Sequence, residues 1–193
     1  MAKVIKEYER RTSQKQTPEE PTVSSVYVED YEFQYGQVNY KNKVVLDVGA
    51  DIGSTAFFFL EKGAELVVAV EGSAKCFRRL KVNAKVSPKV VPVQCFIDNP
   101  AQIEDLILRW KPDIVKMDIE GSEIHLFQAV DRVFGSVQEY LIEVHNNDLL
   151  KMLKEKCAVN SFEVINIRPQ SPSDAMPPYI VYVRKINDIL IIA

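Results

Sequence analysis

The hydrophobic and polar positions follow two alternating patterns from residue 43 onward. Short continuous apolar runs, such as residues 44–46, are typical of strands that are buried on both faces of a sheet. Between these runs lie longer segments of helix length that mix apolar and charged residues. The pattern predicts strands over residues 43–49, 65–71, 89–97, 113–119, 137–145, 161–169 and 179–185. It predicts helices over residues 54–63, 73–85, 100–110, 122–134 and 147–159.

This alternation predicts a doubly wound α/β fold. The expected sheet is seven-stranded and mostly parallel, with helices on both faces, because right-handed crossovers place helices on each side. The last two strands are joined only by the proline-rich segment 168–178 and not by a helix. We therefore expect one antiparallel strand near one edge of the sheet.

The segment before residue 43 has a different character. Residues 1–22 are polar and contain two prolines, and residues 22–36 alternate β-branched or aromatic residues with polar ones. This pattern predicts an arm followed by a short strand or hairpin. The predicted organisation is thus an N-terminal region over residues 1–42 and one main domain over residues 43–193.

Composition narrows the choice of partners and compartment. The 193-residue chain has a net charge of −3, so its overall charge does not favour a polyanionic partner. Residues 76–89 form a basic cluster, which we interpret as the solvated face of a helix. Three isolated cysteines indicate a reducing compartment. The charged N-terminus, and the absence of any apolar run of about 18 residues, favour a cytoplasmic location and no membrane contact.

The loop after the first predicted strand carries the most distinctive chemistry. In a doubly wound sheet, ligands bind beyond the carboxyl ends of the strands. Gly49 permits a tight turn there, and Gly53 lets backbone approach a ligand at the start of the next helix. Asp47, at the end of the strand, would repel a phosphate but suits a ligand with an ammonium group. A nicotinamide dinucleotide is therefore a poor match, and the methionine end of S-adenosylmethionine is a good one.

Two later strand ends add acidic groups. Glu71 closes the second strand, where a carboxylate can accept hydrogen bonds from both hydroxyls of a ribose. Asp98 and Asn99 follow the third strand, where they either contact an adenine or form an Asn-Pro turn without a ligand. The combination of a glycine loop with an acid at the next strand end predicts a nucleotide-like cofactor.

These motifs resemble those of the FkbM family of class I S-adenosylmethionine-dependent methyltransferases. The resemblance covers about residues 40–185 and includes the segments 44–54, 67–73, 79–85, 114–123 and 140–145. The most specific is Lys-Met-Asp-Ile-Glu-Gly-Ser-Glu at residues 116–123. Gly72 departs from the pattern, because the family often has proline after the acidic residue.

The resemblance implies a Rossmann-like methyltransferase fold with S-adenosyl-L-methionine as the cofactor. The implied cofactor-binding residues are Asp47, Gly49, Ala50, Asp51, Gly53, Glu71, Gly72 and Asp98. Asn83 matches an asparagine of the family's second helix, and we interpret it as a support of the local structure.

The carboxyl ends of the fourth and fifth strands supply the candidate catalytic residues. They are Asp118, Glu120, Glu143 and His145. If the acceptor is a hydroxyl, one of them must take its proton, and the pKa range of histidine suits that role. Glu143 and His145 share one face of their strand. Glu123 is interpreted as an acid in the first turn of a helix.

Three questions remain open on the sequence alone. Asp118, Glu143 and His145 could hold a divalent cation, but their spacing does not demand one, and no metal is predicted. The predicted acceptor is a small molecule or carbohydrate, whereas a nucleic acid is disfavoured. The alternatives are an RNA methyltransferase and a catalytically inactive cofactor-binding or interaction module. The apolar segment 186–193 is a candidate contact for a homodimer.

Overall fold

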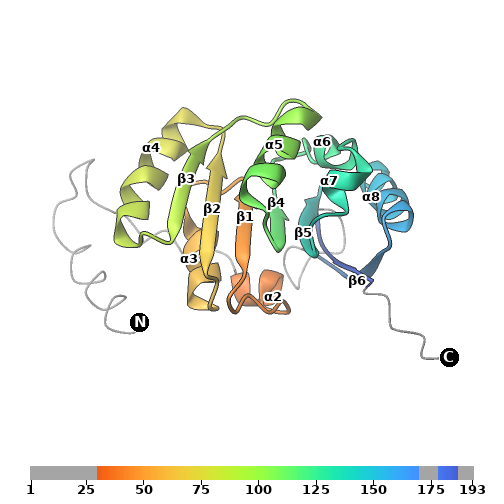
Figure 1. Cartoon of the computed structure of the whole chain (residues 1–193), viewed down its shortest axis with the longest axis horizontal. Coiled ribbons are helices and arrows are strands. Elements are labelled where there is room, and N and C mark those ends of the chain that lie inside the picture. The colour runs from red at the N-terminus through yellow and green to blue at the C-terminus, as the bar shows by residue number, and fades with distance from the viewer. Residues whose placement is uncertain (1–29, 170–177, 187–193) are drawn as a thin grey trace. The chain divides into compact units, whose positions relative to one another are not determined.

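The structure is a computed structural model that describes residues 30–169 and 178–186 (Figure 1). Its strands are β1 (Val44–Val48), β2 (Leu66–Glu71), β3 (Val90–Gln94), β4 (Ile114–Met117), β5 (Glu139–Val144), β6 (Phe162–Pro169) and β7 (Tyr179–Lys185). Its helices are α2 (Tyr31–Tyr35), α3 (Ser54–Glu61), α4 (Ala74–Asn83), the 3₁₀-helix η1 (Ala84–Val86), α5 (Pro100–Trp110), α6 (Ile124–Phe127), α7 (Asp131–Phe134) and α8 (Asn147–Val159).

The sheet has seven strands in the order β3-β2-β1-β4-β5-β7-β6. The pairs β1–β2, β2–β3 and β4–β5 are parallel. Strand β7 runs antiparallel to both of its neighbours, β5 and β6. The predicted mostly parallel sheet, with an antiparallel strand near one edge, is therefore confirmed.

Contacts within the chain divide it into two compact units, one ending at Phe96 and the other beginning at Ile97. The sequence predicted a boundary at residue 42, between an N-terminal region and the main domain. The division at Phe96 rests on contacts alone and does not test that boundary, which stays a prediction. The predicted arm over residues 1–22, most of the proline-rich segment 168–178, and nearly all of the apolar segment 186–193 lie outside the described residues.

The first unit contains three parallel strands whose carboxyl ends carry the glycine loop and Glu71. Helix α3 packs on β1 and β2, and α4 packs on β2 and β3. An aromatic cluster closes the other end of this unit. In it Tyr40 stacks on Phe59 with ring centroids 4.9 Å apart, and the Tyr40 hydroxyl donates to the Tyr35 carbonyl at 2.8 Å. Burial of large aromatic rings is strongly stabilising and fixes the unit's core.

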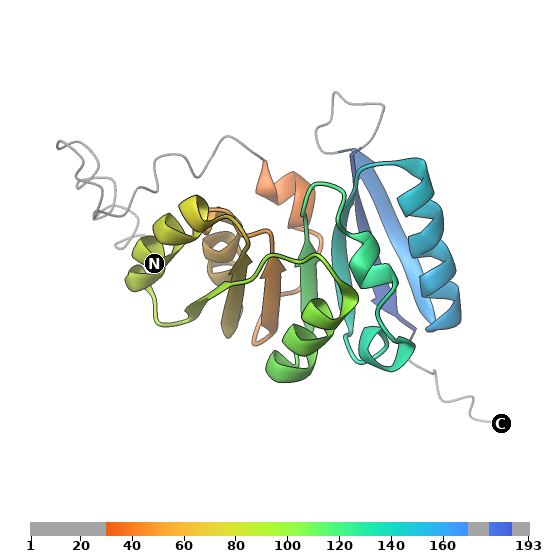
Figure 2. The same ribbon diagram turned by 90° about the horizontal axis from the view of Figure 1, so that it is seen from above.

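The second unit contains the four remaining strands. Helix α8 packs along β5 and β6, and lies beside β6 in both views (Figures 1 and 2). The rings of Phe134 and Tyr140 stack at 4.5 Å, and Phe162 packs edge-on against Phe134. The buried Tyr140 hydroxyl donates to the Phe134 carbonyl at 2.7 Å, which satisfies the polar group of an otherwise apolar core.

Two sequence predictions about elements are wrong. Residues 31–35, expected within a strand or hairpin, form helix α2, whose N-cap Asp30 accepts the backbone N–H of Phe33. The single helix expected over residues 122–134 is instead the two short helices α6 and α7. Val130 adopts an extended conformation between them, and its N–H donates to Glu104 of α5 at 2.8 Å. A tertiary hydrogen bond therefore replaces helical continuity at this point.

Candidate functional site

The loop between β1 and α3 depends on left-handed backbone conformations. Gly49, Asp51 and Gly53 all have positive φ angles, of 82°, 48° and 102°. At Gly53 an added Cβ would also lie 2.9 Å from a methyl group of Leu80. The amides of Gly49 and Ala50 both donate to the Val70 carbonyl at 3.0 Å. The glycines are thus required by the turn itself, which holds the loop against the end of β2.

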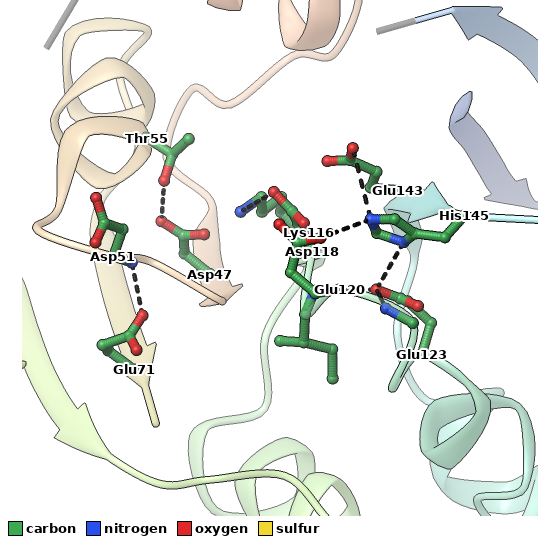
Figure 3. Close-up of polar contacts among 12 residues, drawn as sticks. Asp47, Asp51, Thr55, Glu71, Lys116, Asp118, Glu120, Glu123, Glu143 and His145 are labelled. Carbon is green, nitrogen blue, oxygen red and sulfur yellow. Dashed lines mark hydrogen bonds and ion pairs between the residues drawn. The ribbon is translucent and has the colours of Figure 1, made fainter. Parts of the chain in front are cut away.

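Glu71 fixes this loop from the end of β2 (Figure 3). One oxygen of its carboxylate accepts the N–H of Asp51 at 2.8 Å, and the other accepts the N–H of Ser73 at 2.6 Å. A carboxylate oxygen has two lone pairs, so each oxygen retains capacity for a further donor. The carboxylate therefore organises the loop and remains able to accept hydroxyl groups.

Asp47 lies at the end of β1 and is fully buried. Its Oδ2 accepts the hydroxyl of Thr55, the second residue of α3, at 2.5 Å. The sequence predicts only that Thr55 lies within the helix over residues 54–63. Its hydrogen bond shows that the acid at the strand end also ties β1 to α3.

Two other predicted positions of the first unit have clear local roles. Asn83 is buried and donates to the Ile52 carbonyl at 2.8 Å, which confirms its interpretation as a support of the loop. Gly72 lies against Phe96, because an added Cβ would be 3.0 Å from the Cα of Phe96. That contact explains why a larger residue is absent at position 72. Phe96 is 68% exposed, and sequence reasoning did not single it out.

Asp98 belongs to the start of the second unit, where it borders α5. Its N–H donates to Gln102 at 2.8 Å, and its carboxylate accepts the Asn99 side chain at 2.8 Å. Asn99 and Gln102 form a capping box for α5. These contacts account for the local conformation, and an adenine contact of Asp98 stays a prediction.

The four predicted catalytic residues come together at the ends of β4 and β5. His145 lies at the centre of the group, and its side chain is 20% exposed. Its Nε2 lies 3.4 Å from Glu120 and 3.9 Å from Glu143 (Figure 3). One ligand atom from each of Asp118, Glu143 and His145 fits within 4.8 Å of the others. We call these three residues together with Glu120 the acidic cluster. The shared face predicted for Glu143 and His145 is consistent with this arrangement.

Glu143 is the most perturbed acid of the cluster. Burial raises its pKa to about 9, and the neighbouring Asp118 contributes in the same direction. Glu143 therefore carries a proton at neutral pH and cannot accept one there. Lys116, also buried, places its Nζ 3.7 Å from Asp118.

Glu123 has a different role from the one expected. It is fully buried, and it makes no capping hydrogen bond to the helix that it precedes. Its Oε1 instead accepts the N–H groups of Ile119 and Gly121, at 3.0 and 3.3 Å. The same oxygen lies 3.4 Å from Nδ1 of His145. The interpretation as a first-turn acid is therefore wrong, because this side chain folds back under the loop and faces the histidine.

The loop that Glu123 supports has an unusual backbone. Glu120 and Gly121 have φ angles of 55° and 99°. A non-glycine residue with a positive φ is uncommon and carries strain. The conformation exposes 90% of the Glu120 side chain and places its carboxylate beside His145.

The chain matches no protein-family model. It is 27% identical over 125 residues to the uncharacterized protein 158B of Sulfolobus islandicus rod-shaped virus 1. The aligned region covers 62% of this chain and 72% of that protein. No helix among residues 30–169 and 178–186 is long and apolar enough to cross a membrane.

Solved structures with a similar fold include several methyltransferases. A precorrin-6y C5,15-methyltransferase from Geobacter metallireducens has a TM-score of 0.61 and 17% identity, with 90% of this chain and 100% of that one covered. TrmK from M. capricolum, in complex with S-adenosyl-homocysteine, has a TM-score of 0.64 and 10% identity, with 82% and 69% covered. Fibrillarin from Aeropyrum pernix, with S-adenosyl-L-methionine bound, has a TM-score of 0.57 and 14% identity, with 76% and 68% covered. The likeness shows the Rossmann-like fold of these enzymes.

Proposed function

We propose that the protein is an S-adenosylmethionine-dependent methyltransferase of the FkbM type that methylates a hydroxyl group of a small molecule or sugar. The observation that carries this proposal is the pairing of the glycine loop with Glu71. Asp51 and Ser73 hold the Glu71 carboxylate at the end of β2 while each oxygen keeps a free lone pair. This is the acceptor that a ribose diol requires.

The other loop residues fit the same cofactor. Gly49 and Gly53 bring bare backbone to the start of α3, and Asp47 contributes a buried negative charge at the end of β1. We assign Asp47 to the amino-acid end of the cofactor, whose ammonium group such a charge attracts. When bound, the cofactor supplies a methyl group on a positively charged sulfur.

The acidic cluster is assigned to the methyl acceptor. Methyl transfer depends on alignment of the acceptor oxygen with the methyl carbon, and the hydroxyl must lose its proton. Asp118, Glu120 and His145 are the members that can accept it, whereas Glu143 already carries a proton at neutral pH. The strand after β4 ends in Asp-Ile-Glu-Gly and lacks the prolines of the Asn/Asp-Pro-Pro-aromatic motif of amino-methyltransferases, which favours a hydroxyl over an amine.

An RNA acceptor is the second candidate, because one surface favours it. The exposed residues of and after α4 include Lys75, Arg78, Arg79, Lys81, Lys85 and Lys89. The fold neighbours also include a putative RNA methyltransferase, PH1948 from Pyrococcus horikoshii, with a TM-score of 0.57 and 15% identity. Binding of RNA to this surface would weaken steeply as salt is raised. If the protein does not bind RNA even at low salt, the RNA acceptor is excluded.

Calorimetric titration of the purified chain tests the proposal. S-adenosylmethionine and S-adenosylhomocysteine are each titrated, with NAD as a control for non-specific nucleotide binding. Binding of both sulfur compounds without NAD is the expected result. Binding of neither would overturn the cofactor assignment. Binding of both without turnover, across a wide screen of hydroxyl acceptors, would favour the inactive cofactor-binding module.

A further inference from the structure

The ends of β4 and β5 bring together three side chains of metal-ligand type. Asp118 follows β4, Glu143 lies in β5, and His145 follows β5. One oxygen or nitrogen from each lies within 4.8 Å of the other two. An ion placed among them would lie about 2.8 Å or less from each, and small side-chain movements would bring it to the bond lengths of about 2.0–2.4 Å that divalent cations make with oxygen and nitrogen.

The histidine has a buried carboxylate behind the ring nitrogen that is remote from the site. Nδ1 of His145 faces Glu123, whose carboxylate is fully buried and fixed by the Ile119 and Gly121 amides. Nε2 faces the other way, toward Glu120 and Glu143. A carboxylate behind the remote ring nitrogen is the usual partner of a metal-binding histidine, because it fixes the tautomer and the ring orientation.

The buried glutamate faces another acid. Glu143 is 4% exposed, its carboxyl group shares a hydrogen bond with that of Asp118, and Lys116 is the nearby positive charge. Two carboxyl groups in contact need either a shared proton or a cation between them. A divalent cation that displaced this proton would occupy the space that Nε2 of His145 also faces.

We propose that Asp118, Glu143 and His145 bind a divalent cation of the Mn²⁺ type. On binding, the ion displaces the proton that Glu143 carries in its absence. Two carboxylates and one imidazole then form a mixed oxygen and nitrogen set that suits Mn²⁺ and related first-row ions better than a purely oxygen-ligated Ca²⁺. Glu123 is a positioning residue, which acts through His145. Glu120 remains outside the ligand set, beside the site and exposed to solvent.

The cation would give the acidic cluster a defined task. A hydroxyl oxygen that binds a divalent cation is oriented and becomes more acidic. This role rests on the proposed methyltransferase function, whereas cation binding itself does not. Glu120 is then the member of the cluster that is left to receive the proton.

Electron paramagnetic resonance of the full chain with Mn²⁺ tests the proposal directly. Free Mn²⁺ gives a strong solution spectrum that is lost on binding, so titration yields the affinity without any turnover. Spin-echo modulation from a directly bound ¹⁴N reports coordination by an imidazole. We expect saturable binding with nitrogen modulation, and competition by Zn²⁺. Mn²⁺ that stays free, or that binds without nitrogen modulation, would overturn the assignment.

Variants separate this site from adventitious binding. His145→Gln should abolish the nitrogen modulation, and Asp118→Asn should weaken Mn²⁺ binding at least about tenfold. Glu123→Gln should weaken it by about 10–100-fold while nitrogen modulation is retained at saturation. Glu155→Gln, an exposed acid of α8, is the matched control and should bind as the wild type does. Unchanged affinity in both Asp118→Asn and His145→Gln would place the ion elsewhere and refute the proposal.

Calorimetry with S-adenosylmethionine keeps the two proposals distinguishable. Loss of cation binding with intact cofactor binding would overturn the metal site alone. Cation binding without cofactor binding would overturn the methyltransferase assignment alone. Circular dichroism and thermal melting of each variant identify a fold defect. Asp118→Asn is the variant least expected to unfold the protein, because Asp118 is half-buried at a strand end.

Discussion

Two buried or half-buried acids, Glu71 and Glu123, hold the two loops on which the proposed function depends. Glu71 accepts the amides of Asp51 and Ser73, and Glu123 accepts those of Ile119 and Gly121. Both loops contain residues in the left-handed region, whose amides cannot join a regular helix or strand. A carboxylate accepts several N–H donors at once, so it stabilises such a loop more effectively than a neutral side chain. Glu123 also lies 3.4 Å from Nδ1 of His145.

Glu71→Ala should weaken binding of S-adenosylmethionine by more than about 1 kcal/mol, because it removes a charged acceptor from two ribose hydroxyls. Calorimetry measures the change. Glu65→Ala, an exposed acid just before β2, is the matched control and should leave affinity unchanged. Because Glu71 also holds the loop, the melting temperature of each variant is measured in parallel. Affinity that is unaltered in a folded Glu71→Ala protein would sink the ribose assignment.

Asp118→Asn should leave cofactor affinity intact and suppress turnover by about 10²–10⁴-fold, the range expected when a group that handles a proton or aligns the acceptor is lost. Formation of S-adenosylhomocysteine with an acceptor found by screening gives the rate. Asp105→Asn, an exposed acid of α5, serves as the control. An equal loss of cofactor binding and turnover would instead place Asp118 on the cofactor side.

The sequence predicted the members of the acidic cluster but not what surrounds them. Asp118, Glu143 and His145 follow apolar runs, so their places at strand ends could be deduced from chain order. The inward fold of Glu123 could not, because Ser-Glu after glycine is equally typical of a helix start. Lys116 lies within an apolar strand, and its burial beside Asp118 depends on tertiary packing. Contacts that join distant segments are what a linear pattern leaves out.

At the scale of elements, prediction succeeded where local rules and packing agree. The bounds of α5, α8 and β7 were predicted to the residue. In α5, Pro100 and the Asn99–Gln102 capping box mark the start without help from other segments. The predicted helix over residues 122–134 failed because no glycine or proline interrupts it. Its break at Val130 is set by Glu104 of α5 and by Lys156 of α8, which donates to the carbonyl of Ala129.

Lys156→Met should lower the melting temperature because it leaves the buried Ala129 carbonyl without its donor. The cost of such a group is about 1–3 kcal/mol, and each kcal/mol shifts the melting temperature by roughly 2–4 °C in a chain of this size. Thermal denaturation measures the effect. Lys151→Met, an exposed lysine on the same helix, should change it little. Equal melting of both variants would show that Lys156 does not stabilise the break.

Lys156 also pairs with Asp131, and this second contact leads to a prediction about pH. Hydrogen bonds from Lys156 and Asn160 lower the pKa of Asp131 below its ordinary 3.8. A depressed pKa contributes stability that is present above the unfolded value and is lost as pH falls through the folded one. The difference in melting temperature between the wild type and Asp131→Asn should therefore be constant near neutrality and shrink below about pH 4. A difference that grows on acidification would contradict this linkage.

At the scale of the whole molecule, chemistry is concentrated at the carboxyl ends of the strands. Asp47 and Glu71 end β1 and β2, and Asp118 and His145 follow β4 and β5. Parallel strands direct their carboxyl ends alike, and the loops there are less constrained by sheet hydrogen bonds than the strands are. The opposite ends carry aromatic and aliphatic packing, such as Tyr40 on Phe59. Apolar packing and the proposed ligand chemistry thus occupy different parts of each unit.

Hydrogen exchange measured by mass spectrometry should locate the cofactor on the first unit. Within the segments 49–53 and 71–73, the amides of Gly49, Ala50, Asp51, Gly53 and Ser73 already have protein acceptors, so they exchange when their loops open. A ligand that binds only the closed form slows that exchange by about 100-fold at a concentration 100 times its Kd. S-adenosylmethionine should therefore protect both segments in the wild type and in Glu65→Ala, whereas at the same concentration the protection in Glu71→Ala should be at least about fivefold smaller. NAD should protect neither segment. If the cofactor binds by calorimetry but leaves both segments exchanging at their unliganded rates, its site lies elsewhere in the chain, and the pairing of the glycine loop with Glu71 is structural only.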